Sequence, residues 1–176
     1  MSKLFVESNQ FQNLSLDLAK KVESSDFKPD VIVGVSRGGC IPAIIVHEYL
    51  NYKGIYCDYY NISTKCYEDD NTRGDSVFVD MSEHTKQKLR ESKKILIVDD
   101  VFDTGYTMMN IGNYLFGMGI HSDKFNIATV YYKPKKNRAT IVPHFYTQER
   151  EDWIVFPHEL LGLSDEEVSF KNRLIS

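Results

Sequence analysis

Three carboxylate side chains follow an aliphatic run in the segment ILIVDDVFDTGYT, residues 95–107. Asp99 and Asp100 end the run, and Asp103 lies a little further on, beside a threonine and a glycine. Two carboxylates about 4 Å apart would repel each other by roughly 4 kcal/mol at an effective dielectric constant near 20. Cations or the hydroxyl groups of a ligand would relieve that cost. The spacing therefore indicates a site for a metal ion or a polyol.

The five residues that begin with the third carboxylate have the composition of an anion site. They are Asp103, Thr104, Gly105, Tyr106 and Thr107, and they lead directly into a predicted helix. Backbone N–H groups at a helix N-terminus, two hydroxyl groups and a glycine that permits close approach together favour a phosphate. A sugar phosphate would satisfy both the acids and this loop. Simple helix capping is the alternative for any one residue, but capping needs one acid and not three.

Two other motifs resemble parts of the segment. An aliphatic strand that ends in acids resembles a Walker B strand, but the chain has no GxxxxGK[ST] segment to hold nucleotide phosphates. Asp-Thr-Gly also occurs in aspartic proteases, whose chemistry needs two such aspartates on an all-β scaffold. This chain has a single copy, so only dimerisation would rescue that interpretation.

A second glycine-containing loop follows another apolar strand. Ser36, Arg37, Gly38 and Gly39 come directly after VIVGV and before an apolar helix. The glycines permit unusual backbone angles, and the arginine fork can bind phosphate oxygens. Taken alone, the loop is equally well explained as a solvated turn between a strand and a helix.

The elements that must position these residues alternate along the chain. Helices are predicted at 11–23, 41–50, 82–92 and 108–118, strands at 31–35, 55–62, 78–80, 95–98, 126–132, 140–146 and 153–156, and a short last helix after a capping box that begins at Ser164. Continuous apolar strands between helices predict an α/β fold with a parallel sheet covered on both faces. Ligands of such sheets bind beyond the carboxyl ends of the strands.

Length and composition narrow the function classes. The 176 residues are expected to form one domain, and 42% hydrophobic with 26% charged residues is ordinarily globular. A net charge of −4 argues against a dedicated nucleic-acid binder. No apolar run approaches a membrane span, and the N-terminus lacks the apolar core of a signal peptide. Three cysteines without metal-type spacing fit a reducing compartment, so a cytoplasmic location is expected.

The segment at 95–107 resembles the phosphoribosyl-pyrophosphate signature of the type I phosphoribosyltransferases, with the aliphatic strand, the acid pair and the Asp-Thr-Gly-x-Thr loop all present. The resemblance implies that Asp99 and Asp100 contact the ribose hydroxyls and that loop 103–107 holds the 5′-phosphate. Asp103 would then carry the purine proton. It also implies a Rossmann-like parallel sheet with a small hood formed from about residues 140–176.

The same resemblance implies roles for the loop at residues 36–39. Members of the family bind pyrophosphate at this first loop, and VSRGG is similar to the sequence of the xanthine-guanine enzymes. Those enzymes often carry a cis peptide there, which places the expected bond between Ser36 and Arg37.

The purine site is implied by residues further along the chain. Lys133 follows the strand NIATVYY and matches the lysine that donates to the exocyclic oxygen of a 6-oxopurine, whereas Lys135 and Lys136 are expected in a solvated turn. Trp153 would stack on the base, and the backbone of Trp153 and Ile154 would meet its edge; a core position for the tryptophan is equally consistent with the sequence alone.

Magnesium is the cofactor that the resemblance implies. It would be held by Asp99, Asp100 and Glu159, partly through ligand or water. The family usually has aspartate where Glu159 stands. This departure leaves open whether guanine or xanthine is the preferred base.

The polar segment at residues 63–76 is expected to form a long loop. It is similar to the lid of the 6-oxopurine enzymes, with Tyr67 as the lid residue, although Cys66 stands where serine is usual. A polar loop without function is an equally consistent interpretation.

The resemblance as a whole implies a purine salvage transferase. Such an enzyme converts hypoxanthine, guanine or xanthine and phosphoribosyl pyrophosphate into the nucleoside 5′-monophosphate and pyrophosphate, and relatives are commonly dimers or tetramers. The alternative is a regulatory protein that binds phosphoribosyl pyrophosphate without catalysis.

Overall fold

A computed structural model describes residues 2–67 and 76–175 of the chain. The strands are β1 Lys3–Phe5, β2 Val31–Ser36, β3 Asp58–Tyr67, β4 Ser76–Asp80, β5 Ile95–Phe102, β6 Phe125–Tyr132, β7 Phe145–Glu149 and β8 Trp153–Val155. The α-helices are α1 Ser8–Ser24, α2 Cys40–Tyr52, α3 Glu83–Glu91, α4 Tyr106–Gly117 and α5 Asp165–Ile175, and a 3-10 turn, η1, covers Ser122–Lys124. Within the described residues no helix combines the length and the apolar character that a membrane crossing requires.

The main sheet has six strands in the order β4-β3-β2-β5-β6-β7. All neighbours are parallel except β3 and β4, which pair antiparallel at one edge. The chain adds β3 on one side of β2 and later adds β6 and β7 on the far side of β5. The order of addition therefore reverses between β2 and β5, and this is the point in an open α/β sheet where ligands bind.

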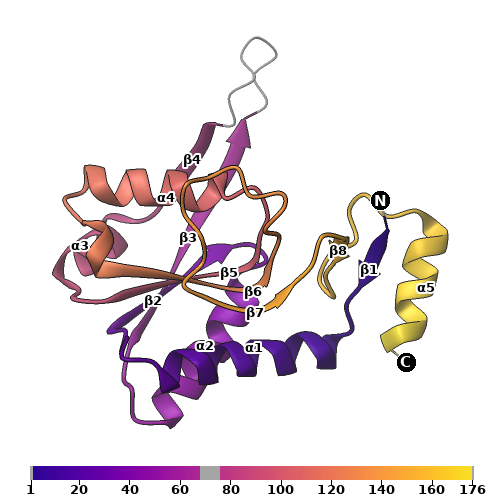
Figure 1. Cartoon of the computed structure of the whole chain (residues 1–176), viewed down its shortest axis with the longest axis horizontal. Helices are drawn as coiled ribbons and strands as arrows, with labels where there is room; N and C mark the ends of the chain where they lie inside the picture. The colour runs from indigo at the N-terminus through magenta and orange to yellow at the C-terminus, as the bar shows by residue number, and fades with distance from the viewer. Residues whose placement is uncertain (1, 68–75, 176) are drawn as a thin grey trace.

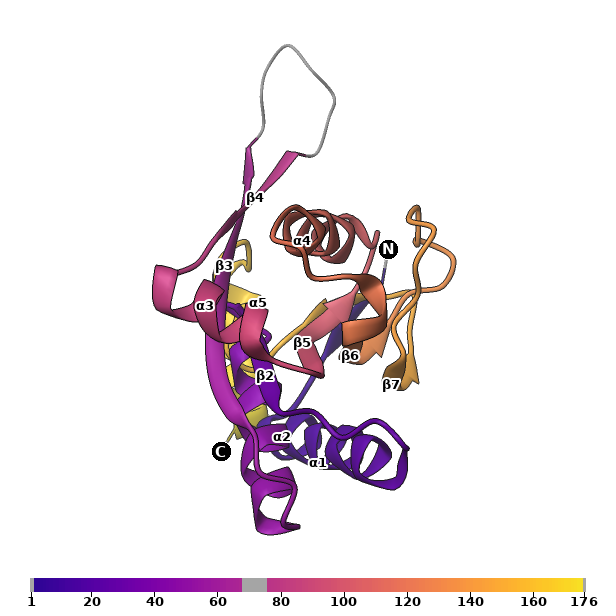
Figure 2. The same ribbon diagram turned by 90° about the vertical axis from the view of Figure 1, so that its left-hand side faces the viewer.

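Helices cover both faces of this sheet, as the continuous apolar strands predict. Helices α1 and α2 lie below the sheet in Figure 1 and α4 lies above it, and Figure 2 shows the same layers from the side. The lower core joins Leu18 and Leu50 to Ile32 and Leu96, whereas the upper core joins helices α3 and α4 to the opposite faces of the same strands. The predicted α/β fold class is confirmed.

A small second layer stands apart from the main sheet. Strands β1 and β8 form a parallel pair, with Lys3 opposite Trp153, and α5 packs on β1 through a Phe5–Phe170 contact and a Lys3–Glu167 ion pair. These three elements lie together at the right of Figure 1 and are called the hood below. The capping box is confirmed, since Glu167 N donates to Ser164 Oγ and Ser164 N donates to Glu167 Oε2.

Three sequence predictions differ from the structure. The segment predicted as a loop from residue 63 begins as strand, because β3 continues to Tyr67 in antiparallel pairing with β4; backbone pairing at a sheet edge tolerates polar residues on both faces. The strand predicted at 140–146 begins only at Phe145, because Pro143 cannot donate to a ladder. The hood was expected to include all of about residues 140–176. Instead, β7 belongs to the main sheet, and the hood contains β1 from the N-terminal segment.

Candidate active site

The carboxyl ends of three adjacent strands bring the predicted segments together. Ser36 ends β2, Asp99 to Phe102 end β5, and Lys133 follows β6. Because β2, β5 and β6 are parallel neighbours, these ends lie at one edge of the sheet. The sequence predicted that the functional residues lie beyond the carboxyl ends of parallel strands, and the structure shows that the three strands concerned are neighbours.

The acid pair lies within the edge of the sheet. Asp100 is 8% exposed, Asp99 is partly buried, and Asp100 N donates to Asp99 Oδ1 over 3.0 Å. Burial, with the charge of Asp100 as a second cause, raises the pKa of Asp99 well above its ordinary value. Burial and then the charge of Glu159 raise the pKa of Asp100 to about 7. The pair is therefore strained in its ionised form and would gain from a cation or from donor hydroxyl groups.

Asp100 makes stability depend on pH in a direction that can be tested. Because its folded-state pKa of about 7 exceeds the ordinary 3.8, ionising it destabilises the folded state; the penalty is absent below about pH 4, grows toward pH 7 and is complete above it. Asp100→Asn should raise the free energy of unfolding at pH 8 by on the order of 2 kcal/mol and leave it nearly unchanged at pH 4.

Denaturant unfolding of the ligand-free protein at pH 4, 6 and 8, with a chelator present, checks this prediction. Asp26→Asn removes an exposed carboxylate and is the control, with a flat response expected. A gain from Asp100→Asn that is the same at all three pH values would contradict the assigned cause.

The loop after β2 approaches the acid pair very closely. The peptide bond between Ser36 and Arg37 is cis, as the resemblance implied. A Cβ on Gly38 would lie 1.8 Å from Asp100 Oδ2, so only glycine fits there without displacing that carboxylate. Beyond the loop lies a cavity of about 540 Å³, lined by Arg37, Gly38, Ile41, Asp100, His158, Glu159, Leu160 and Leu161.

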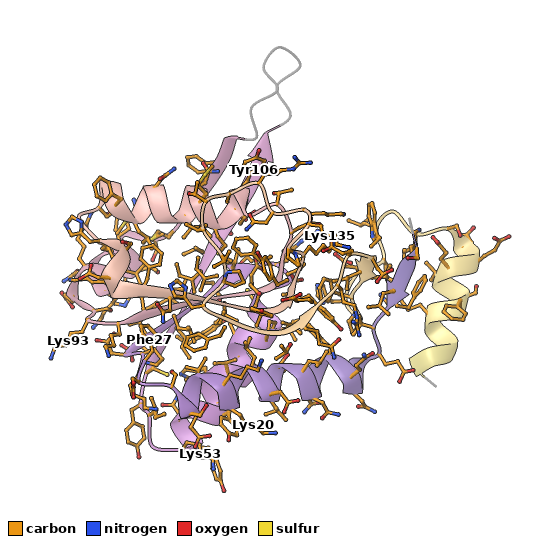
Figure 3. The ribbon with its side chains drawn as sticks, viewed as in Figure 1. Lys20, Phe27, Lys53, Lys93, Tyr106 and Lys135 are labelled. Carbon is orange, nitrogen blue, oxygen red and sulfur yellow. The ribbon has the colours of Figure 1, made fainter. Side chains whose placement is uncertain are left out.

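The loop after β5 leads into helix α4, as the sequence predicts. Gly105 precedes α4 with a φ of 84°, a left-handed conformation that favours glycine, and a Cβ there would also meet Phe102 at 2.8 Å. The loop lines a cavity of about 190 Å³ together with both acids, and the lining residues include Asp99, Asp100, Asp103, Thr104, Gly105 and Thr107. Tyr106 lies at the start of α4 (Figure 3) and is absent from that lining.

Asp103 and Lys133 form an ion pair at the centre of a third cavity. Lys133 Nζ donates to Asp103 Oδ2 over 2.8 Å, and the lysine side chain is 6% exposed. Asp103 Oδ1 is buried and has no hydrogen-bond partner among the described residues, so this carboxylate has one unsatisfied acceptor. The cavity measures about 230 Å³ and is lined by Val101, Asp103, Lys133, Lys136, Trp153, Ile154, Phe156 and Glu159.

Backbone hydrogen bonds explain why the lysine turn lies on the acidic loop. Lys133 N donates to Phe102 O, and Arg138 N donates to Thr104 O, each over 2.9 Å. This anchoring also places Lys136 Nζ 3.8 Å from Asp103 Oδ2. The expectation that Lys136 belongs to a solvated turn is therefore wrong, whereas Lys135 is exposed as expected and lies between the main sheet and the hood in Figure 3.

His158 is a residue of the site that the sequence reasoning did not assign. Its Nε2 lies 3.6 Å from Asp100 Oδ2, and its ring stacks on Phe156 with the centroids 5.5 Å apart. Burial lowers the pKa of His158, which favours the neutral form of the ring. Its position within WIVFPHE, between Trp153 and Glu159, was the available signal.

Glu159 lines both the 540 Å³ and the 230 Å³ cavities. Its Oε2 accepts a hydrogen bond from Phe156 N over 3.1 Å, so one carboxylate oxygen is engaged by its own turn. Among the described residues no group of three or more His, Cys, Asp or Glu could hold a metal ion. The acid pair fits a magnesium ion that takes most of its ligands from a bound phosphate compound and water, which is the usual coordination of that ion.

The three cavities share their walls. Asp100 lines the cavities at the β2 and β5 loops, Asp103 lines those at the β5 loop and the lysine turn, and Glu159 lines the remaining pair. The arrangement suits a ligand with three arms that meet between Asp100, Asp103 and Glu159. The predicted lid residue Tyr67 contributes strand backbone, but residues 68–75 of the predicted lid lie outside the described residues.

The chain is similar to known proteins over most of its length. The family model described as phosphoribosyl transferase domain matches residues 7–161 of the chain. The chain is 29% identical over 161 residues to a xanthine-guanine phosphoribosyltransferase of Idiomarina loihiensis, covering 90% of this chain and 88% of that protein.

Solved structures give the same picture. A purine phosphoribosyltransferase from Pyrococcus horikoshii superposes with a TM-score of 0.71 at 29% identity, covering 94% of this chain and 99% of that chain. A Neisseria gonorrhoeae protein solved with bound ppGpp superposes with a TM-score of 0.77 at 23% identity, covering 98% of this chain and 95% of that chain, and at this identity the likeness concerns the fold alone.

Proposed function

Since the chain belongs to the phosphoribosyl transferase domain family, we propose that it is a 6-oxopurine phosphoribosyltransferase of purine salvage. It would convert hypoxanthine, guanine or xanthine and phosphoribosyl pyrophosphate into a nucleoside 5′-monophosphate and pyrophosphate. The observation that carries the proposal is the set of three neighbouring cavities that share Asp100, Asp103 and Glu159 as lining residues. A phosphoribosyl donor with an incoming base has three arms on one ribose, namely the 5′-phosphate, the pyrophosphate and the base.

Each cavity receives one arm in this proposal. The 5′-phosphate binds the loop 103–107 at the start of α4, where backbone N–H groups and two threonine hydroxyls converge. Pyrophosphate binds the loop 36–39, where Arg37 can donate a bidentate pair of hydrogen bonds. Asp99 and Asp100 accept hydrogen bonds from the ribose hydroxyls, which offset the mutual repulsion of the pair.

The base binds in the cavity beside the lysine turn. Lys133 moves its hydrogen bond from Asp103 to the exocyclic oxygen at purine C6, and an ammonium donor does not pair with the amino group of adenine. Trp153, 57% exposed in the ligand-free protein, offers a flat face for stacking on the base. The backbone of Trp153 and Ile154 meets the edge of the base.

The reaction joins purine N9 to ribose C1 as the bond from C1 to pyrophosphate breaks. Catalysis then rests mainly on positioning and on stabilisation of an oxocarbenium-like state. Magnesium, held by Asp99, Asp100 and Glu159 partly through ligand or water, would supply neutralisation of the leaving pyrophosphate. The Asp103 carboxylate, which is 38% exposed, accepts the purine proton.

Several finer features belong to the same proposal. The chain acts as one phosphoribosyltransferase domain in the cytoplasm, where the free thiols of Cys40 and Cys57 stay reduced. A dimer or tetramer is proposed by analogy with relatives. Tyr67 remains the proposed lid residue.

The decisive experiment measures pyrophosphate release with phosphoribosyl pyrophosphate, magnesium and each of hypoxanthine, guanine, xanthine and adenine in turn. We expect turnover with at least one 6-oxopurine and a lower turnover in Asp103→Asn, because the variant cannot accept the proton. Turnover with adenine alone would refute the role of Lys133. Saturable binding of phosphoribosyl pyrophosphate without turnover would favour the regulatory alternative.

A further inference from the structure

A lysine of the last helix is buried beneath the turn that carries His158 and Glu159. Lys171 lies on α5 and is 3% exposed. Its Nζ donates to Phe156 O over 2.7 Å and also donates to Glu159 O. Lys171 forms no ion pair within the described part of the chain. Among the described residues, the hydrogen bonds of this ammonium go to backbone carbonyls.

Burial of an unpaired ammonium is unfavourable, and a methionine or leucine of similar length would fill the same space without that cost. Burial lowers the pKa of Lys171, and the charge of Glu159 acts in the opposite direction. A buried charge at this position is therefore not explained by packing. Its two hydrogen bonds define a geometry instead, because both acceptors lie in one short turn.

The turn is closed by hydrogen bonds that converge on Phe156. Glu159 N donates to Phe156 O over 3.0 Å, and Phe156 N donates to Glu159 Oε2 over 3.1 Å. Lys171 adds a third connection, from a helix 12 positions away in sequence. The side chains that this turn directs outward are His158, 3.6 Å from Asp100, and Glu159, which lines two of the three cavities.

We propose that Lys171 is a positioning residue, which fixes the Phe156–Glu159 turn in the shape that sets His158 against Asp100 and Glu159 between two cavities. Lys171 itself lines none of the cavities described above. The inference rests on the proposed function for its effect on substrates, but its structural part is independent of that function. The last helix thereby becomes part of the active-site architecture, although it lies in the hood.

The test compares Lys171→Met with Phe170→Ala. Lys171→Met keeps the length of the side chain and removes the donors, whereas Phe170→Ala removes the contact of α5 with Phe5 and leaves the turn untouched. We expect Lys171→Met to raise KM for phosphoribosyl pyrophosphate about tenfold with less than a threefold change in kcat. The reason is that apparent affinity falls in proportion to the fraction of molecules whose Phe156–Glu159 turn has the binding-competent conformation. Phe170→Ala should leave KM within about twofold of the wild-type value.

Two further measurements keep the inference independent of turnover. Amide exchange in a peptide spanning residues 156–163 should be faster in Lys171→Met and unchanged in Phe170→Ala. Lys171→Arg retains hydrogen-bond donors at this position. It should show the exchange rate and the KM of the wild-type protein, and it replaces Lys171→Met in the comparison if that variant is too unstable to purify. Titration of the single tryptophan, Trp153, with a purine nucleoside monophosphate reports binding at the site without catalysis.

Equal effects of Lys171→Met and Phe170→Ala on KM would assign the change to helix docking and overturn the proposal. Unchanged exchange and unchanged KM in Lys171→Met would do the same. Absent turnover in the wild-type protein would refute the proposed function instead, while faster exchange in Lys171→Met would still support the positioning role.

Discussion

Replacing Lys133 with alanine is expected to lower kcat/KM for hypoxanthine, guanine and xanthine by about 100-fold. The side chain is 6% exposed and contacts Asp103 at 2.8 Å. Loss of a hydrogen bond to a charged group costs up to about 3 kcal/mol, and each 1.36 kcal/mol is a factor of ten in rate. The variant loses the donor to the exocyclic oxygen and leaves Asp103 with only the more distant Lys136, 3.8 Å away.

Steady-state kinetics with each purine separately measure this effect. Lys135→Ala is the matched control, because it removes an exposed lysine of the same turn whose backbone N–H, bonded to Glu151, is retained. Adenine provides the internal comparison, since its amino group gains nothing from an ammonium donor and selectivity against it should fall. An unchanged preference for 6-oxopurines in Lys133→Ala would show that another group reads the base.

Gly39→Ala should abolish most activity through a purely steric route. A Cβ at this position would lie 2.7 Å from Asp99 Cα and 2.7 Å from Val35 O, and both are backbone atoms that side-chain rotation cannot move. The loop after β2 must therefore shift relative to the acid pair. A misplacement of about 1 Å can cost on the order of 100-fold in rate, and overpacking adds about 1–3 kcal/mol of destabilisation.

Calorimetric binding of phosphoribosyl pyrophosphate with magnesium, together with thermal unfolding, separates these two effects. Gly117→Ala is the control, since a Cβ on this last residue of α4 would meet nothing within 4 Å. It should leave binding unchanged and stability equal or slightly higher. Wild-type affinity in Gly39→Ala would mean that the loop adapts without disturbing Asp99, which the close backbone contact argues against.

The site could be predicted from the sequence wherever its residues are neighbours along the chain. Asp99, Asp100 and the loop to Thr107 form one continuous segment, and the resemblance of VSRGG to the xanthine-guanine enzymes implied the cis bond after Ser36. The α/β fold class followed from apolar strands that alternate with helices. The fold class and the acidic segment depend on local pattern, which is visible in a single chain.

The features that sequence reasoning missed all depend on contacts between distant segments. Nothing in the residues around Lys3 indicates that β1 pairs with β8, because three residues carry no periodicity. The sequence alone assigns Lys136 to a solvated turn. In the structure, backbone hydrogen bonds hold that turn against the acidic loop and place Lys136 beside Asp103. Lys171 is one charged residue in a polar helix, and only the fold shows that its ammonium lies inside the hood.

The pairing of β1 with β8 has a consequence for the order of events during synthesis. Lys3 lies opposite Trp153 in the register, so 150 positions separate the two halves of this small sheet. At a translation rate of about 5–20 residues per second, β1 waits roughly 10–30 s for its partner strand to emerge. The main sheet can assemble during that time. Strand β1 has no partner strand through most of elongation, so the β1–β8 pair that carries Trp153 forms last.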